Sequence, residues 1–76
     1  MSGRLPQLSY RKVAKALQRA GLVLDHATGS HHFFIHPRDP TILVSVPRHS
    51  KDIKRGLLHR IVKDAGLTVE EFLALL

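Results

Sequence analysis

The fold is decided by the stretch Ser30–Pro47, which reads SHHFFIHPRDPTILVSVP. Its two halves, SHHFFIHP and TILVSVP, are rich in aromatic or β-branched residues, and this composition predicts two strands. Pro37 ends the first strand and Pro47 the second, and the RDP between them supplies turn residues. Because this connection is too short for a crossover helix, we expect the two strands to be antiparallel neighbours.

The residues upstream add a strand and a helix. LVLDHA at residues 22–27 predicts a strand that a Thr-Gly turn joins to SHHFFIHP, which gives a three-stranded antiparallel meander. Ser9 is a favourable N-cap for the helical segment YRKVAKALQRAG, and Gly21 is expected just beyond the end of that helix. The apolar face of this helix is expected to comprise Val13, Ala16, Leu17 and Ala20.

Two helices are predicted downstream of the sheet. The first should begin within the irregular basic segment RHSKDIKRG and end at Gly66. A short final helix follows, because Thr68 and Glu71 have capping-box spacing and Leu67 with Phe72 fits a hydrophobic staple. The apolar face of the first of these helices is expected to comprise Leu57, Leu58, Ile61, Val62 and Ala65.

These elements predict an α+β fold: a helix, a three-stranded antiparallel sheet, a helix and a short C-terminal helix. We expect one domain over residues 1–76, with residues 1–7 as a loose N-terminal tail that contains Pro6. The helices should cover one face of the sheet and leave the other face open to a partner.

Composition limits the partners and the compartment. The 76 residues carry a net charge of +6, which favours a polyanionic partner, either nucleic acid or an acidic protein. The chain lacks cysteine, a signal-peptide core and any apolar run long enough for a membrane helix, so we expect a cytoplasmic protein without membrane association. The basic residues concentrate at residues 48–63, with a second group at residues 11–19.

The histidines of SHHFFIHP admit three interpretations. Alternation along a strand places His31 and Phe33 on one face, and His32, Phe34 and His36 on the other. The histidines can be half-buried sheet residues, ligands of a metal such as zinc, or general acids and bases. Charge favours the third interpretation, because an RNA strand is anionic and carries its own nucleophile, the 2′-hydroxyl. A histidine flanked by lysine and arginine supplies the proton transfers and the cations for RNA cleavage without a metal.

Three motifs carry a resemblance to a known family. GSHHFF from Gly29, VPRHSK from Val46 and AGLTVEEF from Ala65 occur in this order and at intervals that resemble the HicA toxins, the mRNA interferases of bacterial toxin–antitoxin modules. The resemblance implies a fold like that of a double-stranded-RNA-binding domain and metal-independent cleavage of mRNA that inhibits translation and growth. It also implies a HicB-like antitoxin as partner, and we expect a free monomer that forms a hetero-oligomer with this antitoxin.

The resemblance places the catalytic histidine of the Gly-Ser-His motif at His31. We expect no metal and no other cofactor. Phe33 and Phe34 can stack on bases, although an aromatic core is the simpler interpretation. Two other functions remain open: a non-catalytic double-stranded-RNA-binding domain, and a protein-interaction module with a basic face. The predicted RNA contacts are Gly29, Ser30, His32, Arg48, His49, Lys51, Lys54 and Arg55.

Overall fold

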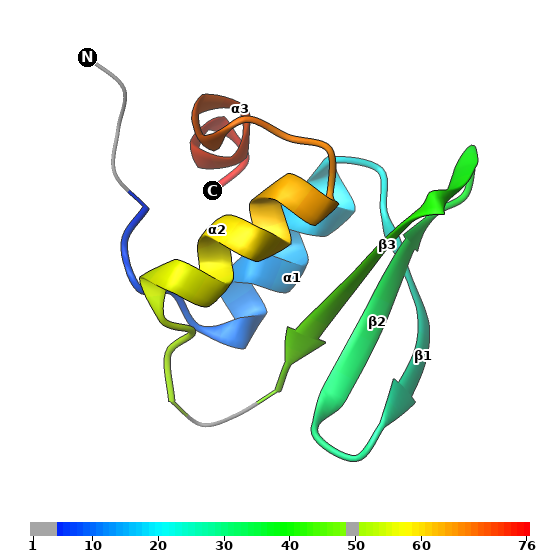
Figure 1. Ribbon diagram of the computed structural model, residues 1–76, viewed down its shortest axis with the longest axis horizontal. Coiled ribbons are helices and arrows are strands. Elements are labelled where there is room, and N and C mark those ends of the chain that lie inside the picture. The colour runs from blue at the N-terminus through cyan, green and yellow to red at the C-terminus, as the bar shows by residue number, and fades with distance from the viewer. Residues whose placement is uncertain (1–4, 49–50) are drawn as a thin grey trace.

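A computed structural model of the chain describes residues 5–48 and 51–76. It confirms the predicted α+β class and the predicted order of helix, three antiparallel strands, helix and short helix (Figure 1). The elements are α1 (Tyr10–Arg19), β1 (Val23–Thr28), β2 (His31–His36), β3 (Asp39–Pro47), α2 (Arg55–Asp64) and α3 (Val69–Ala74).

The strands follow one another in the sheet in the order β1-β2-β3, with antiparallel pairing throughout. The central strand β2 therefore has a partner along each edge. The helices α1 and α2 both contact β3, and α3 contacts α2 (Figure 1). No helix among the described residues is long and apolar enough to cross a membrane.

The helix boundaries follow the capping signals. The Ser9 side chain accepts a hydrogen bond from the backbone N–H of Lys12 at the start of α1. At the start of α3, the Thr68 side chain accepts from the N–H of Glu71, whose carboxylate accepts from the N–H of Thr68, so the predicted capping box is present. Gly21, just past α1, has a φ of 98°, a left-handed conformation that favours glycine.

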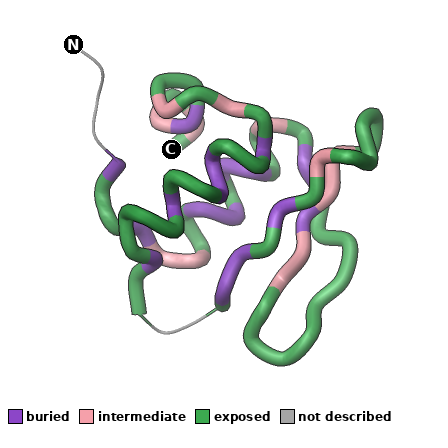
Figure 2. Tube along the Cα trace, viewed as in Figure 1, coloured by how far each residue is buried: buried purple, intermediate pink, exposed green. Residues whose placement is uncertain are grey.

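The core lies between the sheet and the helices, where buried segments of α1, α2 and β3 face one another (Figure 2). One face of the sheet contributes Phe34, Val44 and Val46, each at most 1% exposed. The helices contribute Val13, Ala16, Leu17, Leu58, Ile61, Val62 and Phe72.

Two predictions about apolar residues are wrong. Leu5, placed in the loose tail by the sequence, is fully buried in the core, and Leu8 pairs with Ile53 in an isolated bridge. These contacts hold the backbone before α1 against the start of α2. Burial of the leucine side chains stabilises this arrangement. Leu57, predicted to belong to the core face of α2, is 42% exposed.

Candidate active site

His31 is positioned by the turn between β1 and β2. Gly29 supplies a left-handed residue with a φ of 54°, which lets the chain reverse within two residues. The carbonyl of Ser30 then accepts a hydrogen bond from the N–H of Arg48, which ties the turn to the end of β3. His31 follows as the first residue of β2, between Thr28 on β1 and Pro47 on β3, and it is exposed to solvent.

The two faces of β2 have different surroundings, as the alternation predicted. Phe34 is 1% exposed on the core face, and His32 lies on that same face with its Nδ1 atom 2.7 Å from the hydroxyl oxygen of Tyr10. His31 and Phe33 project from the opposite face. The strand thus separates one histidine that is held by α1 from another that is presented to solvent.

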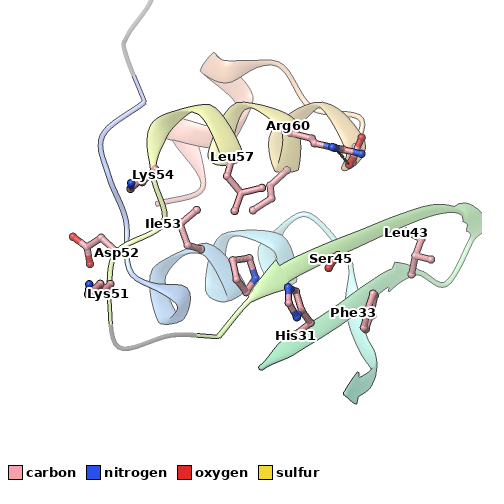
Figure 3. A pocket seen from close by; sticks show the side chains of 13 residues that line it. His31, Phe33, Leu43, Ser45, Lys51, Asp52, Ile53, Lys54, Leu57 and Arg60 are labelled. Carbon is pink, nitrogen blue, oxygen red and sulfur yellow. Dashed lines mark ion pairs between the residues drawn. The ribbon is translucent and has the colours of Figure 1, made fainter. Parts of the chain in front are cut away.

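An open groove of about 930 Å³ runs between that opposite face of the sheet and α2 (Figure 3). We call it the β3–α2 groove. His31 and Phe33 border it from β2, and Leu57 projects from α2 toward the sheet (Figure 3). The remaining lining residues are Leu43, Ser45, Pro47, Lys51, Asp52, Ile53, Lys54, Arg60, Ile61 and Asp64.

The groove carries charges of both signs. The lining includes the cations Lys51, Lys54 and Arg60 and the carboxylates Asp52 and Asp64, so it has an excess of one positive charge. The closest pair is Arg60 Nε and Asp64 Oδ2, 3.8 Å apart on successive turns of α2. Because the Arg60 side chain is 80% exposed, this pair holds its guanidinium only weakly, and the cation stays accessible to an anionic ligand.

The groove also has an apolar wall that the sequence did not identify. Leu43 and Leu57 are 48% and 42% exposed, and they line the groove together with Phe33. The α2 residues Leu57, Arg60, Ile61 and Asp64 follow a spacing of three, one and three positions, which places them along one side of a helix. That spacing is visible in the sequence, but it does not show whether this side faces the core or a groove.

Some of the predicted RNA contacts lie away from the groove. The Arg48 guanidinium carbon is 5.5 Å from the centre of the Tyr10 ring, which it covers in a cation–π arrangement beside His32. Burial raises the pKa of the Tyr10 phenol, and the positive charge of Arg48 opposes part of this shift. His32 and Arg48 therefore contact α1 rather than the groove.

The other predicted contacts divide in the same way. The side chain of Arg55 donates from Nε to the carbonyl of Leu5 at 2.8 Å, so it fastens the N-terminal segment. Lys54, which precedes Arg55, lines the groove, and so does Lys51. Gly29 and Ser30 form the exposed turn next to His31. His49 lies outside the described residues.

Within residues 5–48 and 51–76, no three histidine, aspartate or glutamate side chains are grouped as a metal would need. Of the two phenylalanines in GSHHFF, Phe34 is a core residue. Phe33 is half-buried and borders the groove, where a base can reach its ring.

Comparison with known proteins identifies a family. A family model described as the HicA toxin of bacterial toxin–antitoxin systems matches residues 10–67, which is more than half of the 76 residues and extends from the start of α1 to the end of the turn after α2. Among curated proteins, none matches the chain significantly.

Proposed function

Because the chain belongs to the HicA toxin family of bacterial toxin–antitoxin systems, we propose that it is a metal-independent mRNA interferase whose catalytic residue is His31. The observation that carries the proposal is the position of His31, which is exposed at the border of the β3–α2 groove together with Lys51 and Lys54. The toxin would act in the cytoplasm, where cleavage of messenger RNA stops translation and growth.

The proposed reaction uses the nucleophile that RNA already carries. A base removes the proton of the ribose 2′-hydroxyl, the 2′ oxygen bonds to the adjacent phosphorus, and the bond from phosphorus to the 5′ oxygen breaks. The products are a 2′,3′-cyclic phosphate and a 5′-hydroxyl end. An imidazole suits the proton transfer because it gains and loses a proton near neutral pH. DNA lacks the hydroxyl and would not be cut.

The cations of the groove would bind the RNA backbone. Lys51 and Lys54 come from the segment before α2, and Arg60 comes from α2 itself. Such contacts to phosphate position the strand and relieve the charge that develops at the reacting phosphorus. The Gly29–Ser30 turn would bring the backbone of the protein close to the same strand.

The antitoxin of the module is the second proposed partner. We infer a HicB-like protein that covers the β3–α2 groove and so keeps RNA from His31. The excess positive charge of the groove lining suits an acidic surface on that partner. The free toxin would be a monomer that assembles only with the antitoxin.

A cleavage assay with purified protein tests the proposal. The wild type should cut RNA in the presence of EDTA and leave cyclic phosphate ends, whereas His31→Ala should lose activity by about 100-fold or more. His59→Ala is the matched control, because His59 is an exposed histidine of α2 that does not line the groove. Full activity of folded His31→Ala would refute the assignment. RNA binding without any cleavage by the wild type would favour a non-catalytic RNA-binding domain.

A further inference from the structure

A β-bulge distinguishes β1 from the rest of the sheet. Leu24 is opposite Phe34 and His26 is opposite Phe33, so Asp25 is an extra residue without a partner on β2. The bulge lets neighbouring side chains meet, and Oδ2 of Asp25 lies 2.7 Å from Nδ1 of His26. An ionised carboxylate only accepts hydrogen bonds, so Nδ1 is the donor and carries a proton. The atom of His26 that can exchange a proton with a ligand is therefore Nε2.

The ring of His26 lies on the face of the sheet that bears His31. It stacks on Phe33 with ring centres 4.4 Å apart and planes 11° from parallel. Phe33 in turn borders the β3–α2 groove, as His31 does. Pairing from His26 to Thr28 is regular, so His26 and His31 are diagonal neighbours on adjacent strands, with Cβ atoms about 7 Å apart.

Thr28 occupies the place between the two histidines. It is opposite His31 and two residues from His26, so its small side chain borders the gap that separates the imidazoles. In the proposed geometry a phosphate occupies this gap, with one imidazole beside each of two oxygens on opposite sides of the phosphorus, at hydrogen-bond distances of about 3 Å. One histidine can then serve the attacking oxygen and the other the leaving oxygen.

We propose that His26 is a second catalytic residue, the general acid that protonates the leaving group; this inference rests on the proposed function. His31 takes the proton from the 2′-hydroxyl as the bond between the 2′ oxygen and phosphorus forms. Nε2 of His26 gives its proton to the 5′ oxygen as the bond between phosphorus and that oxygen breaks. The two histidines then exchange protons with water and return to their starting states.

The contact with Asp25 decides which histidine is the acid. An acid must carry its extra proton before the bond breaks, and a protonated His26 has a counter-ion already in place because Oδ2 of Asp25 lies 2.7 Å from its ring. His31 instead shares the groove with two lysines and an arginine. Asp25 acts through His26 and is a positioning residue.

A substrate that needs no acid gives the decisive test. In RNA with sulfur in place of the 5′ oxygen at a single cleavage site, a thiolate leaves without protonation. His26→Phe keeps a ring against Phe33 but cannot transfer a proton. It should cut ordinary RNA about 100-fold more slowly than the wild type and the sulfur substrate at nearly the wild-type rate. His31→Ala should be slow on both substrates, and His59→Ala on neither.

Further variants separate chemistry from folding. His26→Ala should repeat the selective defect of His26→Phe, which excludes loss of the ring stack as its cause. Asp25→Asn should slow cleavage of ordinary RNA and spare the sulfur substrate, with an altered pH profile on ordinary RNA. Equal losses on both substrates for the folded His26 variants, or no loss on ordinary RNA, would overturn the assignment of His26. An active His31→Ala protein would instead refute the proposed function at His31, and the two-histidine scheme with it.

Discussion

The hydroxyl oxygen of Tyr10 lies 2.7 Å from Nδ1 of His32, and this hydrogen bond joins the first turn of α1 to the central strand of the sheet. The two rings meet edge to face with centres 5.0 Å apart. His32 thereby has a fixed partner on the core side of β2, and the next residue toward the turn, His31, faces the β3–α2 groove. The contact links the packing of the helix layer to the orientation of the proposed catalytic strand.

Tyr10→Phe should lower the free energy of unfolding by about 1 kcal/mol, because the half-buried hydrogen bond to His32 is lost while the ring remains. Urea unfolding followed by circular dichroism measures the change. His59→Ala, on the exposed side of α2, is the comparison and should alter stability by less than about 0.5 kcal/mol. An unchanged unfolding midpoint for Tyr10→Phe would mean that the bond contributes nothing in solution.

The phenol of Tyr10 should titrate above its ordinary pKa of 10.0, because burial disfavours the charged form more than Arg48 favours it. The chain has one tyrosine and no tryptophan, so tyrosinate absorbance reports this residue alone. The raised pKa contributes stability that is complete below the pKa of the unfolded chain and is lost as pH rises through the folded pKa. Stability of the wild type should therefore fall more steeply in alkali than that of Tyr10→Phe. A midpoint below 10.0 would contradict this account.

Leu57 and Leu58 are adjacent in α2 but should respond differently to truncation. Leu58 is fully buried, so Leu58→Ala should cost about 2–5 kcal/mol of unfolding free energy. Leu57→Ala should cost less than about 1 kcal/mol, since its side chain is 42% exposed along the groove. Chemical denaturation of the two variants measures both. Equal losses would place Leu57 in the core, as its sequence pattern had suggested.

The double variant Lys51→Glu with Lys54→Glu should weaken RNA binding and reduce its dependence on salt. Each lost phosphate contact lowers the slope of log affinity against log salt by about 0.7 for a single strand. Binding is best measured in a His31→Ala background, in which the RNA is expected to stay intact. Lys12→Glu with Lys15→Glu is the matched control on exposed positions of α1. A slope that is equal in both double variants would remove Lys51 and Lys54 from the RNA site.

Arg55 and Lys54 provide a test of structural against ligand-binding cations. Arg55→Met should lower the free energy of unfolding by about 1–2 kcal/mol, because its hydrogen bond to the carbonyl of Leu5 is lost. Lys54→Met should leave stability unchanged and reduce the salt dependence of RNA binding instead. Thermal unfolding and binding titrations of both proteins distinguish the two effects. The reverse pattern would make Arg55 the RNA contact.

The elements that sequence predicted well are those with local causes. Ser9 and Thr68 cap helices through hydrogen bonds within a single turn, so their signatures are readable from neighbouring residues. The short links between strands fix an antiparallel sheet for the same reason. Alternation along β2 separated His31 from His32 correctly, since it depends only on strand geometry.

The features that sequence did not predict depend on distant segments. Leu5 is buried because it meets the start of α2, fifty residues away, where Arg55 holds its carbonyl. Leu57 is exposed because it lines the groove between β3 and α2. The spacing of apolar residues in a helix gives no information about the distance between that helix and the sheet. The bulge at Asp25 follows from the pairing of β1 with β2 and has no marker such as glycine at that position.

The two-sided character of β2 makes the length of this strand as important as its composition. Loss or duplication of a single codon between His31 and Phe34 would move the side chains of the strand residues upstream of the change to the opposite face of the sheet. Each imidazole would then stand where the other belongs, one against Tyr10 and one in open solvent. We would therefore expect in-frame insertions and deletions here to be tolerated far less often than substitutions. This holds even for an insertion or deletion after which the strand still contains every type of amino acid that it had.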